Sequence, residues 1–588
     1  MKKWFKYVKP YLPYFIIGPI CMIVEVIGEV VMPKLLALII NSMNVGELTN
    51  ELSIRTMIQM IVCAVLMMAG GVGGAYFGAK ASVNFAADLR ADMYSKIQSF
   101  AFSDIDKFST GSLVTRLTND VTKVQNFVNM LLRMALRSPG MMVAALVMAI
   151  MTKPSLSIIF AVTMPLLALA IIFISKITLP MFTKMQAAVD DLNSDVQENI
   201  TNVRVVKSFV REDFEIEKFG RANKRVKDTN FDAMKLLIYL SPAMTLFMNL
   251  TVMAVIYFGG PIVLRGEMLV GDLSAFITYV TQILSGLMMV SFLFMTASRA
   301  IASGRRIQEV LCEEVELNDT DAAFPEKTVN SGSVEFRDVC FRYYKNSEEQ
   351  VLDHIDLSIP DGATVGIIGS TGCGKSTLVS MIPRLYDTDA GEVLVDGVNV
   401  RDYSLVNLRE GVGMVLQKNT LFSGSIAENL RWGDENASDE EVRKFADYAQ
   451  ADKFVASFPE GYETPLTQGG TNVSGGQKQR LCIARALLKK PKILILDDST
   501  SAVDTATEAQ IRKAFREELP GATKIIIAQR ISSVQEADMI IVMNDGAITG
   551  VGTHDELLAN NTEYREIYES QTGITVGGEA SVPAGKEG

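Results

Sequence analysis

The chain has 588 residues and a formal net charge of −11, from 67 acidic and 56 basic residues. This length allows roughly three or four folding units around a large buried core. The negative charge repels phosphate backbones, so we expect no nucleic-acid partner. Only two histidines occur, His354 and His554, which excludes a histidine-built metal centre or a Ser-His-Asp apparatus before residue 354. The six cysteines form no C-x-x-C pair, which favours reduced thiols over a disulfide framework or a zinc site.

The first half of the chain is strongly apolar. Hydrophobic residues make up 48% of the sequence, and the mean hydropathy is +0.22. Six apolar stretches are long enough to cross a hydrocarbon core of roughly 30 Å, which needs about 20 helical residues. They run over residues 14–40, 57–79, 136–152, 155–178, 237–264 and 272–296. Only residues 152–154 separate the third and fourth stretches, so these two should form a tight hairpin.

The charge of the connecting segments predicts how the chain crosses the membrane. The two long gaps, 80–135 and 179–236, carry basic residues at helical spacing, whereas the loop NSMNVGELTNELSIRT is acidic and polar. Because basic loops stay inside, both chain ends should be cytoplasmic, with the chain in the inner membrane. The N-terminal segment MKKWFKYVKPYLPYF precedes no small-residue cleavage site and predicts a retained amphipathic elbow on the cytoplasmic face.

The periodicity changes after about residue 320. The segment VEFRDVCFRYY alternates as a strand does, and the apolar strands ATVGIIG, GEVLVDG, KILILDD, TKIIIAQ and MIIVMND then alternate with helical stretches. This pattern is typical of an α/β domain with a largely parallel core sheet. We therefore predict a multidomain membrane protein. It has a six-helix all-α transmembrane domain with long cytoplasmic loops (1–320), a polar linker (321–332), an α/β P-loop nucleotide-binding domain (333–572) and a disordered tail (573–588).

A phosphate-binding loop follows the strand ATVGIIG and opens a helical run. Its sequence, GSTGCGKST, is a full G-x-x-x-x-G-K-S motif. Its glycines would let backbone N–H groups close around the β- and γ-phosphates of ATP, while Lys375 supplies charge and the Ser376 hydroxyl coordinates Mg²⁺. A glycine-rich turn without a ligand would leave Lys375 unexplained. The predicted nucleotide-binding residues of this loop are Gly369, Ser370, Thr371, Gly372, Cys373, Gly374, Lys375, Ser376 and Thr377.

Two further motifs complete the pattern. The apolar strand Ile493–Asp497 ends in a carboxylate, as expected of the second acid of a Mg²⁺ site in P-loop ATPases. Between the phosphate loop and this strand lies the run Val-Ser-Gly-Gly-Gln at 473–477, and with it the sequence resembles the ATP-binding cassette (ABC) ATPases. All landmarks of that family occur in order. The resemblance implies the following further site residues: Tyr343 for adenine stacking, Gln417 beside Ser376 and Asp497 at the metal, the signature residues Ser474, Gly475, Gly476 and Gln477, and Asp504 of the Ser501–Asp504 motif in the catalytic set.

Six spans followed by one such ATPase resemble half of a type IV ABC exporter. The segments FSTGSLVTRLTNDV and ENITNVRVVKSFVRED resemble the intracellular loops that carry the coupling helices of this family. The resemblance implies that two halves assemble, because each ATP lies between the phosphate loop of one ATPase and the signature of the other. One chain would therefore not form a complete site. Glycines at 475 and 476 fit that role, since the backbone must approach a γ-phosphate closely.

The sequence departs from the family at two catalytic positions. Asp498 stands where the family has a glutamate as general base, and Gln529 stands where the family has a histidine at the γ-phosphate. The Asp498 side chain is one methylene shorter, and a misplacement of about 1 Å can cost roughly 100-fold in rate. Glutamine can form a hydrogen bond but cannot carry positive charge. We interpret both as degenerate catalytic residues at a site that holds ATP, with drift in a working enzyme as the alternative.

Fewer residues of the sequence indicate the substrate than indicate the nucleotide site. Glu25 and Glu29 lie in the first span at i and i+4, hence on one helix face. A charge at membrane depth costs about 2.5 to 3.5 kcal/mol on insertion scales, so both carboxylates should face a cavity or helix partners. They are candidates for binding cationic or amphipathic cargo, and the alternative is an interhelical hydrogen bond with one carboxyl protonated. The cluster of Gly70, Gly71, Gly73, Gly74 and Gly78 predicts close helix packing.

The sequence thus predicts ATP-driven export of amphipathic or drug-like compounds by alternating access, with ATP and Mg²⁺ as cofactors. The intact signature and the two altered residues resemble the degenerate-site subunit of heterodimeric bacterial multidrug exporters. The predicted partners are a second half-transporter, the lipid bilayer and a small amphipathic substrate. The alternatives are a homodimeric exporter of lipid or peptide with slow turnover, and an ATP-gated channel or regulatory membrane module.

Overall fold

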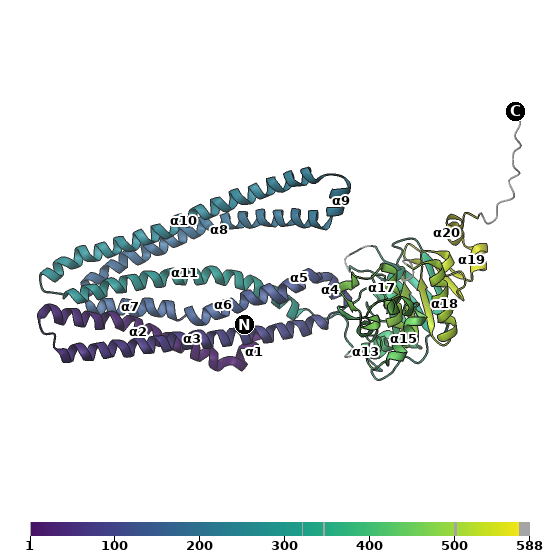
Figure 1. The fold of residues 1–588 in the computed structure, drawn as a ribbon, viewed down its shortest axis with the longest axis horizontal. Helices are drawn as coiled ribbons and strands as arrows, with labels where there is room; N and C mark the ends of the chain where they lie inside the picture. Colours follow the sequence, from purple (N-terminus) through teal and green to yellow (C-terminus); the bar gives the residue numbers. More distant parts are fainter. Residues whose placement is uncertain (1, 320–321, 345–346, 348, 499–502, 575–588) are drawn as a thin grey trace, which may run out of the picture. The chain divides into compact units, whose positions relative to one another are not determined.

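The computed structural model describes residues 2–319, 322–344, 347, 349–498 and 503–574. The chain forms two compact units, one made of Met1–Gln98 with Thr110–Glu313 and the other of Ser99–Ser109 with Glu314–Gly588. The first unit is helical, and the second contains the β-sheets (Figure 1). The predicted fold class, a helical domain followed by an α/β domain, is confirmed. Most of the predicted tail, residues 575–588, lies outside the described residues.

The first unit consists of long helices joined by short connections. In chain order they are α1 (Lys2–Val8), the 3₁₀ turn η1 (Lys9–Tyr11), α2 (Leu12–Val45), α3 (Asn50–Gln98), α5 (Thr110–Thr115), the π turn η2 (Arg116–Asp120), α6 (Val121–Met134), α7 (Arg137–Thr152), α8 (Pro154–Thr201), α9 (Val203–Ser208), α10 (Glu212–Leu264) and α11 (Val270–Cys312). Pro10 and Pro13 lie in the first turns of η1 and α2, where a missing N–H breaks no helical hydrogen bond. The N-terminal segment thus forms a short helix, a turn and then the first long helix.

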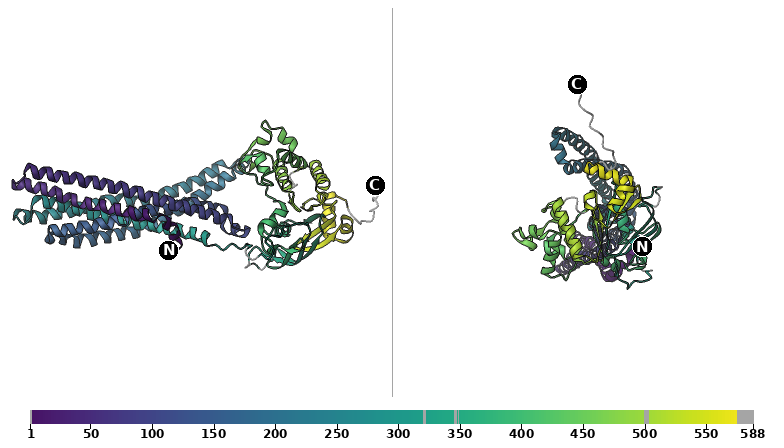
Figure 2. Two further views of the ribbon diagram at one scale, coloured as in Figure 1. Left: turned by 90° about the horizontal axis from the view of Figure 1, so that it is seen from below. Right: turned by 90° about the vertical axis from the view of Figure 1, so that its right-hand side faces the viewer.

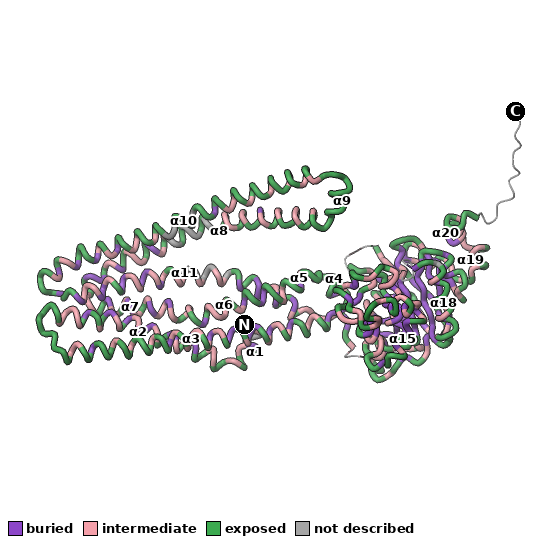
Figure 3. Tube along the Cα trace, viewed as in Figure 1, coloured by how far each residue is buried: buried purple, intermediate pink, exposed green. Residues whose placement is uncertain are grey.

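Several helices of the first unit can cross a membrane. By length and apolar composition, five segments among the described residues qualify: Trp4–Val45, Asn50–Gln98, Thr110–Thr152, Pro242–Leu264 and Val270–Val290. The fourth predicted span lies in α8, whose shorter described apolar part is Pro154–Ala170. Large apolar side chains such as Ile58 and Ile61 are exposed, and Figure 3 shows exposed residues along the outer faces of these helices. A surface of this kind is expected where lipid covers the protein, so the chain is a multi-pass membrane protein.

Small residues allow α2 and α3 to pack closely, and the two helices lie side by side in the left view of Figure 2. A Cβ at Gly70 would lie 2.7 Å from the carbonyl oxygen of Cys21, and one at Gly74 would lie 2.7 Å from Met22 Sδ. The predicted role of these glycines in helix packing is therefore confirmed. Only Lys153 separates α7 from α8, which confirms the predicted hairpin.

The second unit is built on a six-stranded sheet with the order β12-β11-β3-β10-β9-β6, in which all neighbours are parallel except β12. Its strands are β3 (Thr364–Gly369), β6 (Val412–Val415), β9 (Ile493–Asp497), β10 (Thr523–Ile527), β11 (Met539–Asn544) and β12 (Ala547–Gly552). Every residue of β9 and β10 is buried, as expected of central parallel strands covered on both faces. The carboxyl ends of β3, β9 and β10 therefore meet at one edge of the sheet.

A second, antiparallel sheet has the order β2-β1-β4-β5. It comprises β1 (Val334–Phe341), β2 (Leu352–Ile359), β4 (Ala390–Val395) and β5 (Val398–Asn399). A small pair joins β7 (Gly424–Ser425) to β8 (Pro465–Leu466). The helices of the unit are α4 (Phe102–Phe108), α12 (Lys375–Met381), α13 (Leu405–Gly411), α14 (Ile426–Leu430), α15 (Asp439–Tyr448), α16 (Asp452–Ala456), α17 (Gly475–Leu488), α18 (Thr505–Glu518), α19 (His554–Asn560) and α20 (Thr562–Thr572).

The described part of the predicted linker packs against the second unit. The Phe324 N–H donates to the carbonyl of Asp402 at 2.8 Å, and Asn407 Nδ2 donates to the carbonyl of Pro325 at 2.8 Å. The segment holds no helix among its described residues, as its polar, turn-rich composition predicts. The limits of the predicted domains, 1–320, 321–332 and 333–572, stay a prediction.

Candidate functional site

The phosphate loop joins β3 to α12 and requires glycine on steric grounds. Gly369 and Gly374 have φ angles of 156° and 96°, which favour glycine. A Cβ at Gly369 would lie 2.1 Å from the carbonyl oxygen of Met543. Lys375 Nζ donates to the carbonyls of Gly369 and Ser370, at 2.9 and 2.6 Å. Its ammonium group therefore lies against the loop, where it can pair with a phosphate.

The predicted metal ligands Ser376 and Asp497 lie in contact. The Ser376 hydroxyl donates to Asp497 Oδ1 at 2.8 Å, and Asp497 is only 4% exposed. Burial raises the pKa of this carboxyl, with the Ser376 hydrogen bond acting in the opposite direction. A buried carboxylate beside a neutral hydroxyl is a hard oxygen donor set that fits Mg²⁺. Bound there, Mg²⁺ would offset the negative charge of the β- and γ-phosphates.

The two residues that depart from the family, Asp498 and Gln529, are in direct contact. Gln529 Nε2 donates to Asp498 Oδ2 at 2.7 Å. Burial raises the pKa of Asp498, while hydrogen bonds from the amides of Gln529 and Gln417 lower it. Asp497 pairs with Ile527 in the parallel register of β9 and β10, so the residues just beyond each strand end lie side by side. The backbone of Asp498 is left-handed, with a φ of 47°.

Tyr343, the predicted adenine platform, lies close to the phosphate loop. Its hydroxyl is 2.9 Å from Thr377 Oγ1, and its ring is 45% exposed. The ring also packs edge-to-face against Phe341 and Tyr386, with centroids 5.1 and 5.3 Å apart. The exposed face of Tyr343 is thus held next to the loop, as stacking on a bound nucleotide requires.

Tyr386 also contacts α4, the short helix that precedes the predicted loop segment FSTGSLVTRLTNDV. Its hydroxyl donates to Asp106 Oδ2 at 3.0 Å, and its ring lies 6.0 Å from that of Phe102. Burial raises the pKa of Tyr386, so this phenol stays protonated and acts as a donor. A second short helix, α9, lies within the other predicted loop segment. Each segment predicted to carry a coupling helix therefore contains or adjoins a short helix.

The signature residues form the first turn of α17. Ser474 is the N-cap: Gln477 N–H donates to its hydroxyl at 3.3 Å, and Gln477 Oε1 accepts from the Ser474 N–H at 2.9 Å. This reciprocal pair is a capping box. Ser474 and Gly475 are exposed. In the described hydrogen bonds, the side chains of Ser474 and Gln477 each bond to the backbone N–H of the other residue and not to the phosphate loop. The first turn of α17 is therefore open to solvent at Ser474 and Gly475.

Asp504 caps a different helix. Its carboxylate accepts from the N–H and the hydroxyl of Thr507, at 3.0 and 2.7 Å, at the start of α18. The Thr507 N–H is the main cause that lowers the pKa of Asp504. Ser501 and Ala502, which belong to the same motif, lie outside the described residues. The structure therefore gives Asp504 a capping role, and its catalytic role stays a prediction.

One contact at the site was not foreseen from sequence. Gln571, on α20, donates from Nε2 to the carbonyl of Gln529 at 2.7 Å and accepts from the Ile531 N–H at 2.9 Å. A cavity of about 590 Å³ opens between Asp498, Gln529 and Gln571. Helix α20 thus fixes the backbone of the loop that carries Gln529. A single glutamine at the C-terminus carries no signal for this contact in the sequence.

In the first unit, both candidate substrate residues contact a basic residue. Arg137 Nη2 donates to Glu29 Oε1 at 2.6 Å and to Glu25 Oε1 at 3.2 Å. All three side chains are about one-fifth exposed, at 18–22%. Gln282 Nε2 donates to the carbonyl of Glu29 at 2.9 Å, so α2, α7 and α11 meet here. Both carboxylates thus contact a helix partner, as expected, and this partner is Arg137; their role in binding cargo stays a prediction.

Comparisons with known proteins agree with this architecture. Residues 15–288 match the ABC transporter transmembrane region, and residues 352–501 match the ABC transporter ATPase family. An uncharacterized ABC transporter ATP-binding protein of Bacillus subtilis, YfiB, is 38% identical over 97% of this chain and 99% of its own length. An ATP-dependent lipid A-core flippase of Pseudomonas fluorescens is 33% identical over 95% of this chain and 94% of its own.

A solved structure shows the same fold. A bacterial Atm1-family ABC exporter with ATP bound superposes with a TM-score of 0.79 and covers 96% of this chain and 99% of its own, at 24% sequence identity. Both halves of the chain therefore match in the expected order, and the match to YfiB covers 97% of the chain. The chain belongs to the ABC transporter family, as a type IV exporter half in which a membrane-spanning region precedes an ATPase domain whose ATP hydrolysis is coupled to transport.

Proposed function

We propose that this chain is one half of a heterodimeric ABC exporter in which its own nucleotide site binds Mg²⁺ATP without turning it over. Its signature would complete the hydrolytic site of the partner half. The observation that carries the proposal is the contact between Asp498 and Gln529, in which a short carboxylate and a neutral amide occupy both family catalytic positions.

The geometry of Asp498 disfavours its use as a general base. A base must come within hydrogen-bond distance of the water it activates, yet this side chain is short and its Oδ2 already accepts the Gln529 amide at 2.7 Å. The Gln417 amide engages the same carboxyl. Gln529 stays neutral and so adds no positive charge near a γ-phosphate. Binding, by contrast, would rest on Lys375, which lies against the phosphate loop, and on Ser376, which contacts Asp497, and neither depends on Asp498 or Gln529.

The signature supports the second part of the proposal. Its capping box orders the first turn of α17, and Ser474 and Gly475 are exposed. A preorganised, exposed N-terminal turn of a helix is suited to bind the γ-phosphate of an ATP that another chain holds. This half would therefore be catalytically competent toward its partner although its own site is not. Family exporters act as dimers in the bilayer, and the proposal makes this dimer a heterodimer with both chain ends in the cytoplasm.

The test is to purify the chain from native membranes without exogenous overexpression of a partner and to identify the half-transporter that accompanies it. Steady-state ATPase activity is then compared between the pair and the chain alone in nanodiscs. We expect the pair to hydrolyse ATP at an ordinary exporter rate and the chain alone to be slow. A homodimer that matches the rate of the pair would overturn the proposal.

For the cargo, the Glu25–Arg137–Glu29 cluster favours a cationic amphipathic compound. Two carboxylates and one guanidinium leave one negative charge at membrane depth when both acids are ionised. Glu25 Oε2 and Glu29 Oε2 are buried and have no hydrogen-bond partner among the residues that the structure describes. A cationic or donor group of the cargo could satisfy these oxygens, which would recover the cost of burying them.

Transport into inverted vesicles tests this cargo class. Glu25→Gln and Glu29→Gln should each reduce ATP-dependent accumulation of a cationic dye but not of a neutral dye. The matched control is Glu47→Gln, in the exposed loop after α2, which should change neither. A lipid cargo is the second candidate, because two relatives at 33% and 30% identity are named lipid A-core flippases. Flipping of a labelled lipid without dye accumulation would favour it, and dissipation of a preformed gradient would favour a channel.

A further inference from the structure

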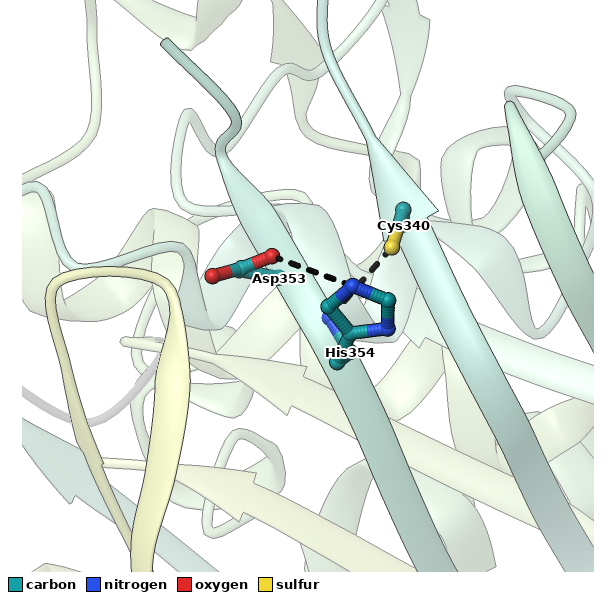
Figure 4. Close-up of side chains that lie close together, drawn as sticks. All are labelled: Cys340, Asp353 and His354. Carbon is teal, nitrogen blue, oxygen red and sulfur yellow. Dashed lines mark hydrogen bonds and ion pairs between the residues drawn. The ribbon is translucent and has the colours of Figure 1, made fainter.

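A thiol, a carboxylate and an imidazole come together at the paired strands β1 and β2. Ligand atoms of Cys340, Asp353 and His354 all lie within 4.8 Å of one another, with Cys340 on one strand and the other two on its neighbour (Figure 4). The Cys340 thiol is 5% exposed, while Asp353 and His354 are open to solvent. An ion could therefore enter from the solvent side and reach the thiol beneath.

Irregular strand pairing produces this cluster. Successive residues of a regular strand point to opposite faces, so Asp353 and His354 would not approach the same thiol. Here the register of β1 and β2 shifts twice, between Phe336 and Val339 and again between Val339 and Phe341. His354 itself has a left-handed backbone, with a φ of 48°. Bulges and left-handed residues of this kind re-aim side chains and are concentrated at functional sites.

Asp338 holds the imidazole from its other side. His354 Nδ1 lies 2.5 Å from Asp338 Oδ1, and Asp338 also has a left-handed backbone, with a φ of 51°. The Asp338 N–H donates to Asp356 Oδ1 at 2.9 Å, which fixes its position in turn. With Nδ1 bonded to a carboxylate, Nε2 is the nitrogen left for a ligand, and it lies 4.0 Å from Asp353 Oδ1. A carboxylate that orients a histidine in this way is the usual outer partner of a metal-bound imidazole.

We propose that Cys340, Asp353 and His354 bind a zinc ion, with Asp338 as a positioning residue and water as the fourth ligand. A thiolate and an imidazole are borderline-soft donors that select zinc over Mg²⁺ or Ca²⁺, and four-coordinate sites of mixed sulfur, nitrogen and oxygen ligands are typical of it. Binding releases the thiol proton of Cys340 to solvent, because the thiolate is the ligand. The cluster involves neither Ser376 nor Asp497, the predicted Mg²⁺ ligands.

A bound ion would clamp the base of the β1–β2 connection. The Val351 N–H donates to the carbonyl of Phe341 at 2.8 Å, which closes this connection one residue before Leu352 begins β2. The connection includes Tyr343, the adenine platform. An ion that joins the two strands should therefore stabilise the folded domain, since a ligand that binds only the native state raises its apparent stability.

The experiment uses the full chain in nanodiscs with its affinity tag removed, and Co²⁺ and Zn²⁺ as probes. Wild-type protein should bind a single Zn²⁺ ion per chain by elemental analysis after dialysis. Co²⁺ should give a thiolate-to-metal charge-transfer band that Zn²⁺ abolishes. Cys340→Ala should remove this band, and Asp338→Asn should weaken Zn²⁺ affinity by roughly 10- to 100-fold. Cys312→Ser, at an exposed cysteine, and His554→Gln, at the other histidine, are the controls.

The proposal fails if Cys340→Ala keeps the charge-transfer band, or if wild-type protein binds no more Zn²⁺ than the same protein with His354→Gln. It also fails if Asp338→Asn leaves Zn²⁺ affinity unchanged. Should Cys340→Ala not fold, the two exposed substitutions, His354→Gln and Asp338→Asn, decide the question alone, because both side chains lie at the surface. A thermal midpoint that rises with Zn²⁺ only in proteins with an intact cluster would support the clamp.

Discussion

Replacing Asp498 by glutamate and Gln529 by histidine together should raise turnover at this site by more than the product of the two single changes. Asp498 Oδ2 and Gln529 Nε2 are 2.7 Å apart, so each substitution alters the partner of the other. Contacting residues show coupling energies of about 0.5–3 kcal/mol, which is roughly a 2- to 150-fold excess in rate because about 1.36 kcal/mol is tenfold. Residues that act as a unit are strongly non-additive for the same reason.

The backbone makes the single change Asp498→Glu weak. Correcting a misplacement of about 1 Å could restore roughly 100-fold. However, Asp498 has a φ of 47°, and aspartate tolerates this left-handed region better than a longer side chain does. A backbone that relaxes away from this conformation in the variant would shift the carboxylate and lose part of the gain. We therefore expect an increase well below roughly 100-fold from Asp498→Glu alone.

The assay isolates the site by replacing the catalytic glutamate of the partner half with glutamine and measuring steady-state ATP hydrolysis for the four combinations. Asp498→Asn is the control, since it keeps the length and the left-handed preference and removes the charge. Full recovery from Asp498→Glu alone, or single effects that simply multiply, would refute the reasoning. Either result would place the degeneracy elsewhere, for example in the signature of the partner.

Three further substitutions have distinct readouts. Ser474→Ala should nearly abolish the ATPase activity of the pair. The control Ser438→Ala removes the equivalent cap of α15, and it should cost a similar ~1 kcal/mol of stability but leave turnover intact. Equal turnover in the two variants would contradict the role of the signature. Lys375→Ala should lower the amount of ATP that this chain retains after gel filtration, and it should reduce turnover less than Ser474→Ala does. Undiminished ATP retention would contradict the proposal that this chain binds ATP without hydrolysing it. Gln571→Ala removes two hydrogen bonds worth about 0.5–1.5 kcal/mol each, so backbone amide exchange should accelerate at residues 529–531. Thr572→Val is the control. Unchanged exchange would show that Gln571 does not hold the loop that carries Gln529.

Strands with a strong apolar pattern could be predicted from the sequence, and the other strands could not. The predicted strands at β1, β3, β4, β9, β10 and β11 are all present. The strand β2, LDHIDLSI, was not predicted, although its burial alternates, because two aspartates and a histidine interrupt its apolar pattern. The strand β12 contains two glycines in six residues, a composition that usually marks a turn. Local composition therefore predicts the core strands well and the edge strands poorly.

Contacts between distant residues explain what sequence reasoning missed at the site. The motif residues were identifiable because each motif is contiguous, but the contact of Asp498 with Gln529 depends on β9 and β10 being neighbours in a given register. Arg137 lies 108 residues from Glu29, and no local pattern links the two. The sequence offers no sign of which helix supplies a positive charge to Glu25 and Glu29.

A site that holds ATP without hydrolysing it can still act on its own unit, and the aromatic contacts indicate a route to α4, which belongs to that unit. Tyr343 packs against Tyr386, and the Tyr386 hydroxyl donates to Asp106 of α4. The Tyr343 hydroxyl is bonded to Thr377, in the first turn of α12 beyond the phosphate loop. A nucleotide stacked on Tyr343 would thus contact the ring that packs against Tyr386, the residue bonded to α4. This connection requires nucleotide binding and no turnover. If the site is degenerate, as proposed, the connection gives a physical reason for the phosphate loop to stay intact.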